Sequence, residues 1–296
     1  LDHARHLHGL ITPFKDDDSI DYAALEKLVS DQVRQKVDGL VVCGTTAESA
    51  TLTDAEKTEL FVWMKKIAEP AGLKLIAGTG TNDTRETIRR TRACGELGYD
   101  QFLIVTPYYN KPQETGLKRH FTAVADAAPG EVILYNVPGR TGLSLSARLI
   151  AELAGHPKMR TIKEASGDLA LASDIRCELA TANHTMDLVS GDDPTFFPFL
   201  ALGGVGTISV ASHLLALPMR KILEAVQSGQ ITEARKLHDR YFSIFKKLFM
   251  ETNPVPVKYA MAKKLNFSPR VRSPLGDLSE ENRTEWDRLL AETLWP

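Results

Sequence analysis

The sequence predicts an α/β protein with the (β/α)8 fold of a TIM barrel and a C-terminal helical extension. The main observation is a repeated order, in which a short apolar segment, a turn and an amphipathic helix recur roughly every 25–35 residues. Eight such units follow one another in the 296-residue chain, and a barrel of this kind takes about 250 residues. The loop after the first apolar segment, TPFKDDDS at 12–19, contains no glycine, whereas a doubly wound sheet usually has GxGxxG there. These observations favour the closed barrel over the open sheet.

Eight short apolar segments are expected to be the strands, because each is bounded by polar or turn-forming residues. An amphipathic segment follows each of them, as a parallel sheet with crossover helices requires. The expected strands comprise residues 8–11, 39–43, 74–77, 101–105, 132–135, 161–163, 187–190 and 206–210.

The segments between the strands have helical periodicity, which the first of them illustrates. Leu25, Leu28, Val29 and Val33 recur at a spacing that places them on one buried stripe of a helix. Asp21 stands just before this stripe, where its carboxylate can accept a hydrogen bond from a free backbone N–H. We therefore expect a helix that begins after Asp21.

Two further helices carry N-terminal signals. Thr53 and Glu56 have the spacing of a capping box, in which each side chain accepts a hydrogen bond from the backbone N–H of the other residue. Asp83 and Glu86 have the same spacing, with aspartate as the cap. We expect the reciprocal arrangement at both helix starts.

The chain has no low-complexity linker and no break in composition. We predict a (β/α)8 barrel over residues 1–228 and a C-terminal helical region over residues 229–296 that packs on the barrel. Helices of the second region are expected at 231–249, 255–265 and 280–294.

Composition excludes several classes of protein. Hydrophobic residues make up 43% and charged residues 25% of the chain, which are globular values and exclude disordered and fibrous classes. The net charge of −2 gives no reason to expect nucleic acid or a membrane as a partner. No apolar run reaches the roughly 18 residues of a spanning helix.

Cysteine usage and the N-terminal residues favour the cytoplasm. Cys43, Cys94 and Cys177 are odd in number and far apart, which argues against a disulfide framework or a structural zinc site. The first residues, LDHARHLH, lack the order of a secretory signal. No HExxH motif and no clustered set of metal ligands is present, so we expect no metal and no cofactor.

The chemistry of a βα barrel lies at the C-terminal ends of its strands. Polar and glycine-rich segments end or follow six of the expected strands, at residues 44–49, 78–80, 106–110, 135–141, 163–168 and 190–193. The eighth expected strand itself carries such a segment, at residues 203–209.

Lys163 is the most informative of these strand-end residues. A lysine at the mouth of a barrel loses hydration, which favours the neutral amine. A neutral amine can attack a ketone carbon and form a Schiff base. The alternative is a lysine that pairs with a neighbouring carboxylate, such as Glu164 or Asp192.

Other strand-end residues fit the same chemistry, and each also has a structural interpretation. Tyr135 can relay protons or simply pack. Thr45 and Thr46 can hold a carboxylate with hydroxyl and backbone N–H groups, or form a turn. Arg140 can bind a second carboxylate or remain solvated. The GGVG segment at 203–206 can approach an anion or pack closely. Together they indicate aldol chemistry on an oxo acid without a metal.

Several long motifs in the same order resemble the dihydrodipicolinate synthase family, which belongs to the pyruvate-dependent class I aldolase and N-acetylneuraminate lyase superfamily. The resemblance extends from about residue 8 to about residue 278. Its motifs are GTTAES at 44–49, TPYYNKP at 106–112, YNVPGRTG at 135–142, IKEASG at 162–167, SGDD at 190–193, GGVGTIS at 203–209 and NPVPVK at 253–258.

The resemblance implies roles in catalysis. Lys163 matches the lysine that forms the Schiff base with pyruvate, and Tyr135 matches a proton-relay tyrosine. Thr46 matches the threonine that links this tyrosine to a second one. Tyr109 matches the second tyrosine, which in the family reaches across a dimer interface into the neighbouring site. The family is usually a homotetramer built as a dimer of dimers.

The resemblance also implies roles in substrate binding. Thr45 and Thr46 match the groups that hold the pyruvate carboxylate. Ile208 matches a backbone contact to pyruvate, and Gly191 lies in the matching pocket wall. Arg140 matches the arginine that binds the carboxylate of the aldehyde substrate.

The expected activity is the condensation of pyruvate with L-aspartate 4-semialdehyde, which belongs to the diaminopimelate and lysine pathway. Two alternatives stay open at this point. One is another pyruvate-dependent class I aldolase, such as a sugar-acid or sialic-acid lyase. The sialic-acid lyases typically lack the Gly-Arg-Thr segment found at 139–141, which does not distinguish the sugar-acid aldolases. The other is a non-catalytic barrel that binds a keto acid.

Two departures from the family pattern bear on function. Ala47 stands where the family usually has glycine, and alanine would cost about 1 kcal/mol if this position needs a positive φ. Asp54 and Lys57 stand where lysine-inhibited members often have histidines. We therefore expect weak or absent inhibition by lysine, although other residues match the allosteric lysine pocket, namely Ser49, Ala50, Asn82, Glu86 and Tyr108.

Overall fold

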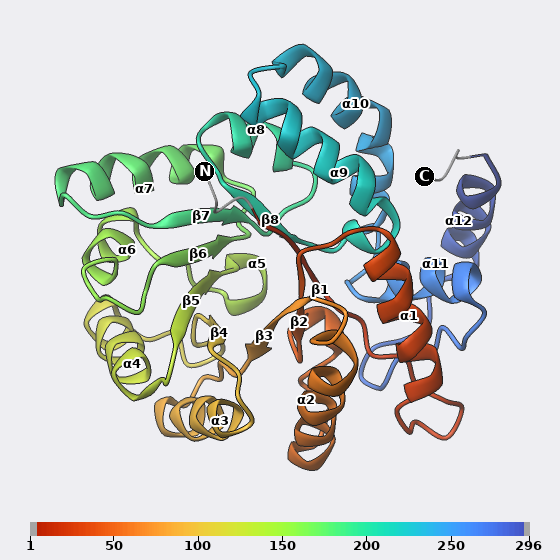
Figure 1. The fold of residues 1–296 in the computed structure, drawn as a ribbon, viewed down its shortest axis with the longest axis horizontal. Coiled ribbons are helices and arrows are strands. Elements are labelled where there is room, and N and C mark those ends of the chain that lie inside the picture. The colour runs from red at the N-terminus through yellow and green to blue at the C-terminus, as the bar shows by residue number, and fades with distance from the viewer. Residues whose placement is uncertain (1–4, 293–296) are drawn as a thin grey trace. The chain divides into compact units, whose positions relative to one another are not determined.

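The computed structural model describes residues 5–292. Eight strands form a closed barrel in sequence order, and the strand pairs with a described register are parallel, which confirms the predicted (β/α)8 fold (Figure 1). The strands are β1 (Arg5–Gly9), β2 (Gly39–Val42), β3 (Lys74–Gly78), β4 (Gln101–Val105), β5 (Glu131–Asn136), β6 (Thr161–Glu164), β7 (Asp187–Ser190) and β8 (Gly206–Ser209).

The first strand lies earlier than predicted, at Arg5–Gly9 and not at 8–11. The predicted start was wrong because His6 reads as polar, whereas it is fully buried, as is His8. Nε2 of His6 lies 2.7 Å from Oγ of Ser212, and burial lowers the pKa of His6 to about 4. A histidine that stays neutral can therefore occupy a buried strand position.

The chain divides into two compact units. The first contains Leu75–Ile208, and the second contains His6–Lys74 together with residues 209–292. The predicted division of the chain at residue 228 remains a prediction.

In the first unit, the helices α3, α4, α6 and α7 lie in a row outside strands β4 to β7 (Figure 1). Ile104, Ile133 and Ile162 on the strands are almost completely buried beneath them. The helices of this unit are α3 (Thr84–Glu96), α4 (Glu114–Ala127), α5 (Pro138–Thr141), α6 (Ala147–Leu153), α7 (Leu169–Thr181) and α8 (Phe196–Ala201).

The start of α3 confirms half of the predicted capping arrangement. Asp83 accepts hydrogen bonds from the N–H groups of Arg85 and Glu86. The reciprocal half was wrong, because the N–H of Asp83 donates to the Thr81 hydroxyl. Glu86 instead binds two arginines on its own helix.

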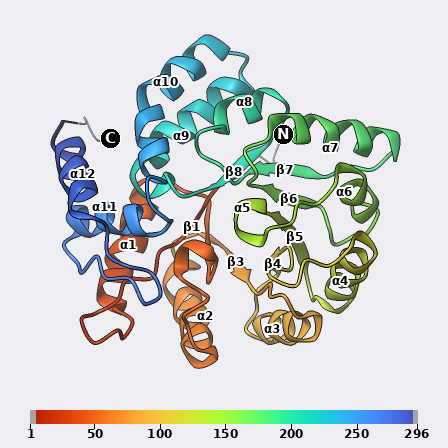
Figure 2. The ribbon, with the colours of Figure 1, turned by 180° about the vertical axis from the view of Figure 1, so that it is seen from behind.

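The second unit contains the remaining helices, with α11 in contact with α1, α9 and α12 (Figure 2). Asp21 caps α1 by accepting from the N–H of Ala24, and Thr53 with Glu56 forms the complete capping box of α2, as predicted. The elements are α1 (Tyr22–Arg34), the 3₁₀ helix η1 (Thr45–Ala47), α2 (Asp54–Ala68), α9 (Ser212–Gln227), α10 (Ile231–Lys247), α11 (Val255–Leu265) and α12 (Glu280–Glu292).

The three predicted C-terminal helices are all present. α11 has the predicted bounds, and α10 ends two residues early, at Lys247. The last predicted residues of α12, 293–294, lie outside the described residues. Within residues 5–292, no helix combines the length and apolar character needed to cross a membrane.

Candidate active site

Lys163 and Tyr135 lie side by side at the C-terminal ends of adjacent strands. They are register partners of the parallel pair β5 and β6, so both side chains point to the same face of the sheet. Nζ of Lys163 lies 4.2 Å from the centre of the Tyr135 ring. Lys163 is 9% exposed and Tyr135 6%, which places an amine and a phenol together in a largely dehydrated site. A buried amine beside a proton donor is the arrangement that imine chemistry requires.

The two carboxylates considered as alternative partners of Lys163 are engaged elsewhere. Glu164 accepts from Nδ2 of Asn136 at 2.7 Å and from the N–H of Ser166 at 2.6 Å. Asp192 accepts from the Thr195 hydroxyl at 2.7 Å and from its N–H. The geometry therefore favours a nucleophile over the structural ion pair.

Gly191 forms the wall against which the Lys163 side chain packs. A Cβ at this position would lie 2.8 Å from Cε and 3.1 Å from Cγ of Lys163, and 2.6 Å from Cβ of Ala165. Real Cβ atoms do not approach other heavy atoms so closely, so the absence of a side chain creates the space for the lysine.

Asn136 and Glu164 support the site from the opposite face of the sheet, a role that was not predicted from the sequence. They are register partners one position after Tyr135 and Lys163. Oδ1 of Asn136 accepts from the N–H of Leu145. Burial raises the pKa of Glu164. The sequence contains a signal for this role. Asn136 follows Tyr135 and Glu164 follows Lys163, and successive residues of a strand face opposite sides of the sheet.

Two candidate residues of the first unit lie on the surface beyond these strand ends. Arg140 is exposed on the short helix α5, directly after β5. Tyr109 is 90% exposed and has a φ of 71°, a conformation that is unusual for a bulky side chain. Tyr108 beside it is 39% exposed, and its carbonyl accepts from Nδ2 of Asn82 at 3.2 Å.

Ile208 lies on β8 and is buried, with 1% of its surface exposed. The hydroxyl of the preceding residue, Thr207, donates to the carbonyl of Ser190 on β7. This bond holds the end of β8 beside the strand that leads into Gly191.

Thr45, Thr46 and Ala47 form the 3₁₀ helix η1 of the second unit, directly after β2. The hydroxyl of Thr46 accepts from Nδ2 of Asn253 at 3.0 Å. The positive φ values near this turn fall on Cys43 and Glu48 and not on Ala47. The conditional cost of alanine at position 47 therefore does not arise.

The residues that match an allosteric lysine pocket are divided between the units. Asn82, Glu86 and Tyr108 belong to the first, and Ser49 and Ala50 to the second. Glu86 accepts from Nε of Arg89 at 2.7 Å and from Nε of Arg90 at 2.6 Å, and these bonds lower its pKa to about 2. Its charge is thus already neutralised by side chains of α3 itself.

Residues 2–293 match the model of the dihydrodipicolinate synthetase family. The chain belongs to this family. A member from Thermosynechococcus vestitus, named 4-hydroxy-tetrahydrodipicolinate synthase, is 44% identical over 88% of this chain and 87% of its own length.

Solved structures of the family have the same fold as this member. The dihydrodipicolinate synthase of Aquifex aeolicus superimposes with a TM-score of 0.92 at 36% identity, over 98% of this chain and 97% of its own. The chloride-inhibited enzyme of Acinetobacter baumannii, solved in complex with pyruvate, gives the same TM-score at 35% identity, over 98% of both chains.

Proposed function

We propose that this chain condenses pyruvate with L-aspartate 4-semialdehyde, which is the reaction of 4-hydroxy-tetrahydrodipicolinate synthase in diaminopimelate and lysine biosynthesis. The observation that carries the proposal is the buried pair of Lys163 and Tyr135, with Nζ 4.2 Å from the ring centre. The names of the full-length relatives and the pyruvate complex of a structural neighbour support it.

Lys163 supplies the nucleophile. Its Nζ adds to the ketone carbon of pyruvate, and loss of water gives an imine. Removal of one methyl proton then moves the C–H electron pair into a carbon–carbon double bond and produces the enamine. Tyr135, Thr46 and Tyr109 carry these protons in our proposal, with Tyr109 contributed by a second copy of the chain.

The enamine carbon forms the new bond to the aldehyde carbon of the second substrate, whose oxygen takes a proton. The amine of that substrate then attacks the imine carbon and displaces Nζ of Lys163, which closes the ring and frees the enzyme. The protein contributes positioning and charge stabilisation to these steps.

Different residues bind the carboxylates of the two substrates in this proposal. Thr45 and Thr46 hold the carboxylate of pyruvate, with Ile208 as a backbone contact and Gly191 as the pocket wall. Arg140 binds the carboxylate of the aldehyde, because an exposed guanidinium can form two parallel hydrogen bonds to it. The site needs no cofactor in this scheme.

We propose a homotetramer assembled as a dimer of dimers, in the cytoplasm. The exposure of Tyr109, 90% in the single chain, supports an interface that covers it. Sedimentation of the protein tests this assembly. A native protein that sediments as a monomer would contradict a site to which a second copy contributes Tyr109. The variant Tyr109→Ala is expected to lose activity.

The activity itself is tested by product formation from pyruvate with a panel of aldehydes. L-Aspartate 4-semialdehyde is expected to be the preferred acceptor. The variant Lys163→Ala is expected to abolish turnover. The control variant Lys158→Ala is expected to retain it, because this half-buried lysine donates to the carbonyl of Ala128. A preference for a sugar-derived aldehyde would identify a different aldolase. Full turnover by Lys163→Ala would contradict the mechanism.

A further inference from the structure

A buried ion pair holds the turn that carries Thr45 and Thr46. This turn ends at Glu48, which has a φ of 56° and donates its N–H to the carbonyl of Thr45. The side chain of Glu48 is 1% exposed, and its Oε1 lies 2.5 Å from Nζ of Lys258, which is 0% exposed. Its Oε2 accepts from the N–H of Arg272 at 2.9 Å. Both carboxylate oxygens are therefore fixed by the C-terminal part of the chain.

A second contact reaches the same turn from the same part of the chain. Nδ2 of Asn253 donates to the hydroxyl of Thr46 at 3.0 Å. Asn253 lies two residues before α11, and Lys258 lies in the first turns of that helix. The segment 253–258 thus binds both a hydroxyl and a carboxylate of one short turn, so the position of α11 determines the position of Thr46.

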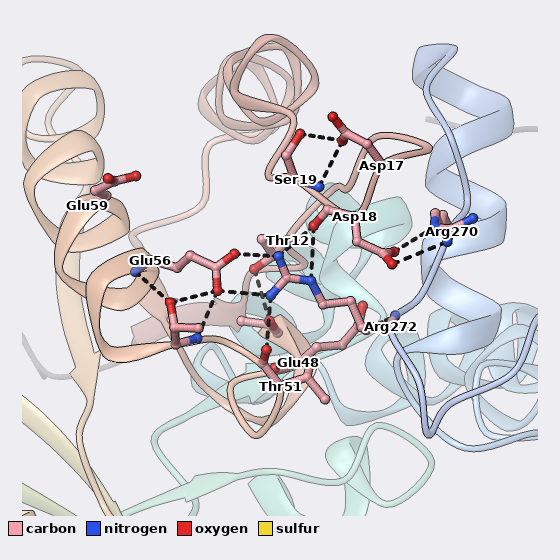
Figure 3. Close-up of polar contacts among 12 residues, drawn as sticks. Thr12, Asp17, Asp18, Ser19, Glu48, Thr51, Glu56, Glu59, Arg270 and Arg272 are labelled. Carbon is pink, nitrogen blue, oxygen red and sulfur yellow. Dashed lines mark hydrogen bonds and ion pairs between the residues drawn. The ribbon is translucent and has the colours of Figure 1, made fainter.

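Arg272 makes further contacts around the same turn, which Figure 3 shows. Its guanidinium pairs with Glu56 and donates to the carbonyls of Thr51, at 2.9 Å, and Asp18. The ring of Phe14 packs against both cations, 4.0 Å from Nζ of Lys258 and 4.3 Å from Cζ of Arg272. The turn therefore has little freedom to move.

Stability alone is a poor explanation for this pair. Removing a carboxylate and an ammonium from water carries a large desolvation penalty, and well-packed apolar replacements are often neutral or stabilising. Burial lowers the pKa of Lys258 to about 8, which reflects this cost. What a buried pair gives, and apolar side chains do not, is a defined direction for its hydrogen bonds.

We propose that Glu48, Lys258 and Asn253 are positioning residues, which orient the hydroxyls of Thr45 and Thr46 toward the carboxylate of pyruvate. The inference rests on the proposed function, in which these hydroxyls bind that carboxylate. The three residues do not contact substrate in this account, because each acts through the turn.

The double variant Glu48→Gln/Lys258→Met tests the inference, since it removes both charges and leaves neither unpaired. The KM for pyruvate is expected to rise roughly tenfold, whereas the KM for L-aspartate 4-semialdehyde changes less than about twofold. A merely structural role would lower the fraction of folded enzyme, and hence the apparent kcat, without changing the KM for pyruvate.

A matched control removes another ion pair of the same helix. Lys264 on α11 binds Asp31 on α1 at 3.0 Å, away from the turn. The variant Asp31→Asn/Lys264→Met is expected to keep the native KM for both substrates. An equal rise in the KM for pyruvate in this control would overturn the inference.

Borohydride trapping with pyruvate separates the two hypotheses. A native protein that forms no adduct would overturn the proposed function and this inference with it. A native protein that forms the adduct, together with a double variant of unchanged pyruvate dependence, would overturn the inference alone. If the double variant does not fold, Asn253→Ala replaces it, because this change leaves both buried charges paired. The same selective rise in KM is then expected, and an unchanged KM refutes the inference.

Discussion

Gly191 faces the aliphatic chain of Lys163 so closely that a single added methyl group would lie 2.8 Å from Cε of the lysine. The wall of the site is thus defined by the absence of a side chain. Because Cβ of Ala165 would be 2.6 Å away on another side, the added group has no easy direction in which to move.

We therefore expect Gly191→Ala to displace the lysine and to slow imine formation roughly ten- to hundredfold. The rate of adduct formation with pyruvate measures this effect. Gly276→Ala is the matched control, since no atom lies within 4 Å of the position of its Cβ and its φ is not positive. An unchanged rate in Gly191→Ala would show that the lysine does not act from this conformation.

Arg140→Ala is expected to impair the use of the aldehyde selectively. A lost charge-assisted pair of hydrogen bonds lowers kcat/KM for L-aspartate 4-semialdehyde by roughly ten- to hundredfold. The KM for pyruvate should stay within about twofold of the native value. Steady-state kinetics with each substrate varied in turn measures both.

The control for this prediction is Arg148→Ala, which removes an exposed arginine of the same unit that pairs with Glu152 on its own helix. It should leave both constants unchanged. Equal losses for both substrates in Arg140→Ala would place this arginine outside the aldehyde subsite.

Inhibition by free lysine is expected to be weak. Glu86 is already paired with Arg89 and Arg90, and its pKa of about 2 keeps it charged and bound to them. Lys57 adds a positive charge to the matching set of residues, which disfavours a cationic ligand. Titration of lysine into the steady-state assay should leave most of the rate at millimolar concentration, and strong inhibition at micromolar concentration would refute this.

Stability is expected to fall in mild acid. Burial lowers the pKa of His6, His120 and His213 to about 4, whereas an unfolded histidine titrates near 6.5. Between these values the unfolded chain binds more protons than the folded one, so the stabilisation present above pH 6.5 is lost as the pH falls toward about 4. Each histidine contributes a loss of about 2 kcal/mol at pH 5.

Denaturant unfolding at several pH values measures this loss. In the variant His120→Asn, the free energy of unfolding should fall less steeply with decreasing pH, because asparagine does not titrate in this range. The difference from the native protein is the contribution of one histidine. An identical dependence in native protein and variant would mean that His120 has the same pKa in the folded and unfolded chain, which would contradict this prediction.

The sequence allowed the fold, and the position of Lys163 and Tyr135 at neighbouring strand ends, to be predicted because both depend on local signals. The βα repeat determines the barrel, and a lysine or tyrosine at a strand end is visible in the chain itself. Glu48 and Lys258 lie 210 positions apart, and no periodicity indicates that they pair. The bounds of β1 were misjudged for a related reason, since the partners that keep His6 neutral and buried belong to distant segments.

The central claim is that Lys163 forms a Schiff base with pyruvate. Incubation of the protein with pyruvate and sodium borohydride, followed by intact mass measurement and peptide mapping, tests it most directly. We expect a single reduced pyruvate adduct on the peptide that contains Lys163, and none in Lys163→Ala. A folded native protein without an adduct, or with its adduct on another lysine, would contradict the account.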